Sequence, residues 1–198
     1  MIKNPYYSDT LVKKSAQIIE DLSLSKRPLI KMTPDEVEQF SHFFNWAMQE
    51  NQFTAEVLKN TLCVLAHTYS NHPKLSSTTL ILYSLIKKST LSEAQKEELI
   101  IYFLNSVEKQ FIDPHTREGR PYPEALIIIM RELLKAESFE IVEWTLRTIL
   151  IMGPTNRQFE SSLIDKKPRL LKIFNPKQMQ IFQLIDILRN EWKKNLMN

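Results

Sequence analysis

The chain has 198 residues, of which 43% are hydrophobic, 25% charged and 10% aromatic, a composition typical of a globular protein with a buried core. Its only glycines, Gly119 and Gly153, exclude a phosphate-binding P-loop and the glycine-rich fingerprint of a dinucleotide-binding fold. The formal net charge is +3, and the basic excess lies at the C-terminal end, where nine basic and four acidic residues occur from Arg157 onward.

Helical patterns with marked start signals succeed one another along the chain, and strand signals are nearly absent. Thr33-Pro34-Asp35-Glu36 predicts a capping box with proline at the first helical position, Ser92 with Gln95 predicts a second box, and Asn175-Pro176 predicts another helix start. In chain order, we expect helices at residues 9–23, 34–50, 54–70, 76–89, 92–111, 122–136, 138–152, 156–174 with a break near Pro168, and 176–196. The sequence therefore predicts an all-α protein.

The spacing of the helix starts predicts how the helices are arranged. Two alternating sets of predicted helix starts, at residues 34, 76 and 122 and at residues 54, 92, 138 and 176, have intervals of 38 to 46 residues, close to the repeat of about 40–47 residues in HEAT and armadillo proteins. We therefore expect about nine helices in stacked antiparallel pairs, which resembles a HEAT/armadillo-like α-solenoid in architecture; a compact orthogonal helical bundle is the alternative. Residues 1–198 are expected to form a single all-helical domain, with residues 1–32 as an N-terminal capping helix and loop.

The two predicted helices within residues 122–152 are apolar on more than one side. In the first of them, the polar side chains are confined to a single strip. In the second, Trp144 lies on a second apolar face, and Glu143 and Arg147 have the spacing of an i,i+4 ion pair. We therefore expect residues 122–152 to form the buried middle of the stack, with the surrounding helices each exposing one face.

Two segments without a helical pattern, residues 112–121 and 153–157, contain glycine and proline, and loops on a rigid helical frame often make functional contacts. Antiparallel pairing of the helices would place both segments on the same side of the stack. A basic ridge would then combine Arg117, Arg120, Arg157, Lys166, Lys167, Arg169 and Lys172. This ridge is the predicted binding surface for an acidic partner or a phosphate backbone, and an ordinary solvated helix face is the alternative.

Few residues suggest catalysis or metal binding. Cys63 and His67 lie four positions apart on one predicted helix, as a metal pair or a thiolate–imidazole pair requires, but no second ligand pair accompanies them. A buried structural cysteine is therefore the simpler interpretation. Trp144, Glu143 and Arg147 are the only candidates for an enzyme site of the base-excision type. The sequence predicts no catalytic residue, no cofactor and no metal site.

The expected architecture favours binding over catalysis, because stacked helix pairs present extended surfaces that mostly hold other macromolecules. The first hypothesis is a non-enzymatic scaffold or adaptor that binds a protein partner. The alternatives are a nucleic-acid-binding protein that uses the basic ridge and a base-excision-type enzyme. The N-terminal residues lack an apolar stretch, and the longest apolar run, Ala125 to Met130, is short, so we expect no signal peptide, no membrane span and a cytoplasmic location.

Overall fold

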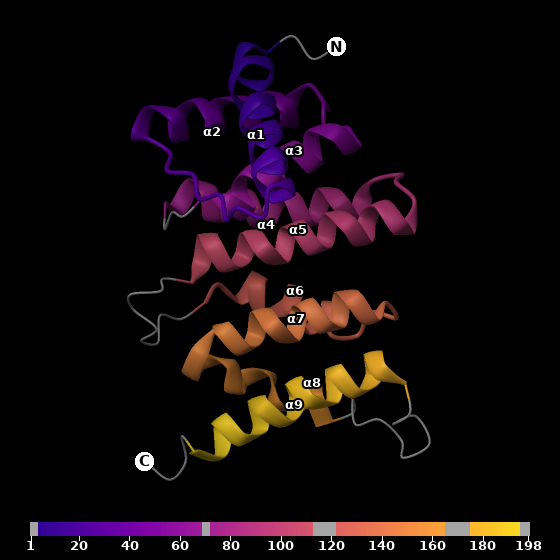
Figure 1. Cartoon of the computed structure of the whole chain (residues 1–198). Helices are drawn as coiled ribbons and strands as arrows, with labels where there is room; N and C mark the ends of the chain where they lie inside the picture. The colour runs from indigo at the N-terminus through magenta and orange to yellow at the C-terminus, as the bar shows by residue number, and fades with distance from the viewer. Residues whose placement is uncertain (1–3, 69–71, 113–121, 165–174, 195–198) are drawn as a thin grey trace. The chain divides into compact units, whose positions relative to one another are not determined.

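The computed structural model describes residues 4–68, 72–112, 122–164 and 175–194 (Figure 1). Within these ranges every regular element is a helix, and the β-type contact is an isolated bridge between Ile30 and Thr68. The prediction of an all-α protein is therefore confirmed. The chain divides into two compact units, Met1–Phe111 and Ile112–Asn198. The single domain over residues 1–198, with residues 1–32 as an N-terminal cap, stays a prediction.

The first unit begins with a short π-helical segment and continues with five α-helices. Their bounds are η1 (Tyr7–Leu11), α1 (Val12–Ser23), α2 (Pro34–Gln49), α3 (Ala55–His67), α4 (Pro73–Lys88) and α5 (Glu93–Phe111). Local capping explains why α2 begins where it does. The Thr33 side chain accepts a hydrogen bond of 3.2 Å from the Glu36 amide, and the Glu36 carboxylate accepts one of 2.9 Å from the Thr33 amide. Ser92 and Gln95 form the second predicted capping box before α5.

Helix α3 forms the centre of the first unit. It packs against α1, α4 and α5, and α1 runs across the direction of the other helices of the first unit (Figure 1). Its buried residues are Val57, Leu58, Thr61, Leu62, Cys63, Val64, Leu65 and Ala66. The expectation that helices outside residues 122–152 each expose one face is wrong for α3, because its neighbours cover it on several sides.

Polar side chains and loop amides close the C-terminal end of α3, where helix carbonyls lack partners within the helix. The buried Gln110 Nε2 of α5 donates to the carbonyl oxygens of Leu65 and Thr68, at 3.0 and 2.6 Å. The Ile30 amide donates to the carbonyl oxygen of His67 at 2.8 Å. These bonds fix α3, α5 and the segment that leads to α2 relative to one another.

The second unit contains α6 (Glu124–Leu133), α7 (Phe139–Ile151), a 3-10 segment η2 (Gly153–Phe159), α8 (Glu160–Ile164) and α9 (Pro176–Lys194). Helix α7 packs against α6, η2 and α9. Gly153 adopts a left-handed conformation with φ of 67°, which ends α7 as the sequence predicts. The helix predicted from residue 156 is a 3-10 helix as far as Phe159 and an α-helix only from Glu160, and its residues from 165 onward lie outside the described residues.

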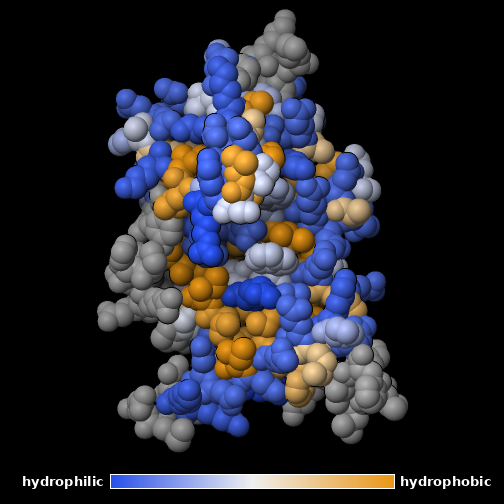
Figure 2. Space-filling model, viewed as in Figure 1, coloured by the Kyte–Doolittle hydropathy of each residue, from blue (hydrophilic) through white to orange (hydrophobic). Residues whose placement is uncertain are grey.

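Not every apolar side chain is buried, and the face seen in Figure 2 shows hydrophobic side chains interspersed among hydrophilic ones. The exposed large hydrophobic residues are Ile19, Leu22, Leu24, Leu29, Met48, Ile81, Ile128, Phe139, Met179 and Ile187. Ile128 and Phe139 belong to the segment predicted to be the buried middle. Ile128 is exposed because it lies one turn from Glu124 on the polar strip of α6.

Candidate functional site

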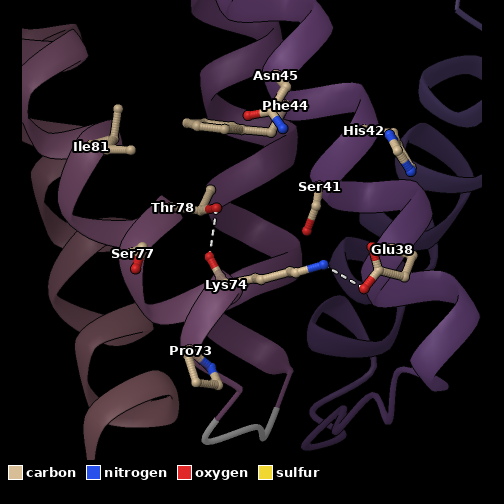
Figure 3. A pocket seen from close by; sticks show the side chains of 10 residues that line it. All are labelled: Glu38, Ser41, His42, Phe44, Asn45, Pro73, Lys74, Ser77, Thr78 and Ile81. Atoms are coloured by element: carbon tan, nitrogen blue, oxygen red, sulfur yellow. Dashed lines mark hydrogen bonds and ion pairs between the residues drawn. The ribbon is translucent and has the colours of Figure 1, made fainter.

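Helix α2 lies between two grooves of the first unit, and both grooves include the exposed side chain of His42. The first is the α2–α4 groove, with a volume of about 400 Å³. It is lined by Glu38, Ser41, His42, Phe44, Asn45, Pro73, Lys74, Ser77, Thr78 and Ile81 (Figure 3). The second is the aromatic groove, with a volume of about 600 Å³. It is lined by Asn4, Pro5, Tyr6, Asp9, Thr10, Gln39, His42, Phe43 and Trp46.

The α2–α4 groove has a charged end and an apolar end. Lys74 forms an ion pair with Glu38 near the N-terminal ends of both helices, and Phe44 and Ile81 lie toward the other end (Figure 3). The Ile81 side chain is 40% exposed, whereas Phe44 is buried. Since both charged side chains of the ion pair are about half exposed, the pair adds little to stability, and its groups remain accessible to a ligand.

The hydroxyl groups of this groove are already engaged by the helix backbone. Thr78 Oγ1 donates to the carbonyl oxygen of Lys74 at 2.8 Å, and Ser41 Oγ donates to that of Val37 at 2.8 Å. Their oxygens can still accept hydrogen bonds, so the walls of the groove offer acceptors beside the Lys74 ammonium.

The charge of Glu38 is stabilised from both helices. The hydrogen bond from Lys74 and its positive charge lower the pKa of Glu38, and His42 and His72 lower it further. His72 itself caps α4, because its Nδ1 accepts a hydrogen bond of 3.3 Å from the Lys74 amide. The charged end of the groove is therefore an ionised carboxylate that is paired with Lys74.

Packed aromatic rings build the wall of the aromatic groove. The ring centroid of Phe43 lies 6.1 Å from that of Tyr6, 6.2 Å from that of Trp46 and 5.5 Å from that of Tyr7. Tyr6 and Phe43 are buried, whereas Trp46 is half-buried and Asp9 is exposed at the edge. The groove thus combines a partly exposed indole with a carboxylate.

The two tyrosines that hold η1 against α2 and α3 differ in their hydroxyl groups. The Tyr7 hydroxyl accepts a hydrogen bond of 3.1 Å from Asn60 Nδ2 and donates one of 3.5 Å to Glu56. The Tyr6 hydroxyl is buried and has no hydrogen-bond partner among the described residues. Burial, with a smaller contribution from Glu36, raises the pKa of Tyr6 well above its usual value, so this hydroxyl stays neutral.

The structure describes one residue of the basic ridge predicted from the sequence, Arg157. Arg157 is exposed and pairs with Glu160, with its Nε 3.5 Å from the Glu160 carboxylate. The other ridge residues, Arg117, Arg120, Lys166, Lys167, Arg169 and Lys172, lie outside the described residues. The ridge therefore stays a prediction, as does the nucleic-acid-binding hypothesis that depends on it.

The candidates for a base-excision site do lie together on the surface of the second unit. The Arg147 guanidinium lies 6.0 Å from the centroid of the Trp144 ring, a cation–π contact, and its Nε donates to Glu143 at 2.9 Å. Gln180 of α9 donates to the same Glu143 oxygen at 2.7 Å. The predicted i,i+4 pair is confirmed, and Arg147 already covers Trp144, whereas a base-binding platform would need an open ring. The base-excision hypothesis stays a prediction.

Cys63 and His67 do not form a catalytic pair. His67 Nδ1 lies 2.8 Å from the backbone oxygen of Cys63, and Cys63 itself is buried. Burial raises the pKa of the Cys63 thiol, against smaller opposing effects of Ser15 and Lys59. In the part of the chain that the structure describes, no three His, Cys, Asp or Glu side chains are placed to hold a metal ion.

Neither groove could be found from sequence patterns, because the lining residues come from separate helices. One signal was present on α2, where Glu38, His42 and Trp46 recur every four residues on one side of the helix. We find no match between this chain and any protein-family model, curated protein or solved structure. Among the described helices, none has the length and apolar character needed to cross a membrane.

Proposed function

We propose that this protein is a non-enzymatic binding module that holds a segment of a partner protein in the α2–α4 groove. The observation that carries the proposal is the open groove between two helices, with exposed Ile81 at its apolar end and the Glu38–Lys74 pair at its charged end. A small-molecule site is usually enclosed and mostly apolar. The α2–α4 groove is open, and its walls offer both apolar and polar groups, which better suits a peptide chain whose backbone and side chains can use both kinds of surface.

The two ends of the groove would bind different groups of the partner segment. An apolar side chain of the partner would cover Ile81 beside the already buried Phe44 and remove the exposed part of Ile81 from water. A polar group near the other end would bond to the Lys74 ammonium or to the Glu38 carboxylate. The charged end would thus fix the direction of the segment, and the apolar end would supply most of the affinity.

Helix packing in the first unit supports this proposal. Helix α2 contacts α4, and α3 contacts α5, so helices that are two places apart in chain order pack against each other. That pattern is expected of stacked helix pairs, and we propose a HEAT-like arrangement on this basis. Helical-repeat proteins commonly use their extended surfaces to hold macromolecules.

Random peptides displayed on phage provide a test that requires no named partner. We expect selection on the full chain to enrich peptides that bind with micromolar Kd, measured by fluorescence anisotropy. The variant Ile81→Asp should weaken the affinity for these peptides at least tenfold, or about 1.4 kcal/mol. Ile19→Asp is the matched control, because Ile19 is 47% exposed on α1 and lines neither groove. Failure to enrich any peptide, or equal binding to both variants, would contradict the proposal.

A further inference from the structure

The aromatic groove on the other side of α2 has the chemistry of a site for a positive charge. Among its described lining residues there is a carboxylate, Asp9, and neither lysine nor arginine. Three of the lining residues are aromatic, and the negative face of an aromatic ring attracts a cation. We infer that the aromatic groove binds a lysine or arginine side chain of the same segment that occupies the α2–α4 groove, an inference that rests on the proposed function.

Trp46 is the residue that would contact this cation. Its ring is half-buried, so it is partly accessible, and Phe43 packs against it with the ring planes tilted by 34°. Phe43 is in turn held by a stacked contact with Tyr7, at an interplanar angle of 21°. The indole is therefore held in place before a ligand arrives, which reduces the entropy lost on binding. Indole is also the aromatic side chain that binds cations best.

Asp9 provides the complementary charge at the edge of the groove. It is exposed on η1, and it already takes part in another interaction within the chain. A carboxylate offers about four acceptor positions, so an incoming cation can bind without displacing an existing partner. Gln39, also exposed in the lining, offers an amide oxygen as a further acceptor.

The two grooves are close enough for one segment to occupy both. His42 belongs to both linings, so the grooves meet at this residue on the exposed side of α2. A helix with its side chains is about 10 Å across, and an extended chain advances about 3.3 Å per residue. Because its two anchor points lie on opposite sides of α2, the bound segment is expected to carry its apolar anchor and its basic residue at least three or four positions apart.

A pair of small probes tests the cation site directly. N-acetyl-arginine methylamide carries the guanidinium, and N-acetyl-citrulline methylamide is its neutral counterpart of nearly the same shape. The measurement is the ¹H–¹⁵N spectrum of the full chain, in which the Trp46 indole signal is identified as the one that disappears in Trp46→Phe. The arginine probe should shift this signal saturably. The citrulline probe should shift it at least fivefold less. Trp144 serves as an internal control, because Arg147 already covers its ring.

Two charge variants complete the test. Asp9→Asn should weaken the response of Trp46 to the arginine probe severalfold, whereas Asp35→Asn, which removes an exposed carboxylate of α2 outside both groove linings, should leave it unchanged. An unshifted Trp46 signal, equal responses to the two probes, or an equal shift of Trp144 would overturn the inference. Because these probes do not depend on peptide selection, the inference and the proposed function can fail separately.

Discussion

The indole Nε1 of Trp192 donates a hydrogen bond of 2.5 Å to Oδ1 of Asn156, and both side chains are almost completely buried. This bond joins α9 to η2 across 36 residues of sequence. The buried Asn156 side chain thereby fixes the 3-10 segment against α9. A buried acceptor that loses its donor costs about 1–3 kcal/mol.

Removing the indole donor should therefore destabilise the second unit. We expect Trp192→Phe to lower the free energy of unfolding by about 2 kcal/mol, from the orphaned Asn156 oxygen and the lost ring volume. Asn156→Ala should have a similar effect, and the double variant should lose less than the sum of the two. Urea unfolding monitored by circular dichroism provides the measurement. Asn190→Ala, at an exposed position of α9, is the control, and a loss as large there would refute the explanation.

Tyr6 and Tyr7 should respond in opposite directions to the same substitution. Tyr6→Phe removes a buried hydroxyl that has no partner among the described residues, so the free energy of unfolding should rise by about 1 kcal/mol. Tyr7→Phe removes the hydrogen bonds with Asn60 and Glu56, so the free energy of unfolding should fall by about 1 kcal/mol. Thermal unfolding of the two variants side by side distinguishes them. Loss of stability in both would show that the Tyr6 hydroxyl has a partner.

Local signals at several helix starts, including those of α2, α5 and α9, made much of the fold predictable. The Thr33 and Ser92 capping boxes involve residues three positions apart, so their hydrogen bonds depend on sequence alone. The grooves could not be found in this way. The Lys74–Glu38 pair joins residues 36 positions apart, and its formation depends on how α4 packs against α2.

Burial was the least predictable property of individual residues. Trp46 lies two positions after the adjacent phenylalanines Phe43 and Phe44, a pattern that indicates a packing residue, yet it is half-buried and lines the aromatic groove. Helix α3 has ordinary polar residues such as Thr61, and only its neighbours in the fold cover them. Periodicity identifies the face of a helix, but the number of neighbours that cover it is set by tertiary packing.

The Lys14–Glu36 pair should make stability depend on acid pH. Burial alone would raise the pKa of Glu36, but hydrogen bonds from Lys14, at 2.6 Å, and from the Thr33 amide, together with the charge of Lys14, lower it below its ordinary value of 4.5. Because the pKa of Glu36 is lowered in the folded state, its ionised carboxylate stabilises the fold above pH 4.5, and this stabilisation is lost as the pH falls below that value.

The variant Glu36→Gln should flatten this acid dependence. Glutamine keeps the capping box, because its side-chain oxygen can still accept the Thr33 amide, but it carries no titrating charge. Melting temperatures measured at intervals below pH 5 should fall less steeply for this variant than for the wild type. Glu93→Gln, at a strongly exposed position that pairs with Lys96, should retain the wild-type slope. An unchanged slope in Glu36→Gln would contradict the assignment.

Ser25 adopts a left-handed conformation after the end of α1, with φ of 57°. A side chain costs about 1 kcal/mol in this region, whereas glycine adopts it freely. Ser25→Gly should therefore raise the free energy of unfolding by up to about 1 kcal/mol in urea titrations. Ser23→Gly, within the last turn of α1, should instead lower it by about 0.5–1 kcal/mol. If both variants were destabilised, the left-handed turn would be absent in solution.

Methyl spectroscopy of a bound peptide tests the central claim most directly. With the isoleucine δ1 methyl groups of the full chain labelled with ¹³C, titration of a selected peptide should shift the Ile81 signal in proportion to occupancy and produce contacts between that methyl and the peptide. The signals of Ile19 and Ile187, which are exposed but lie outside the α2–α4 groove, should stay in place. Saturable binding that leaves Ile81 unshifted while other methyl signals move would contradict a binding role for this groove.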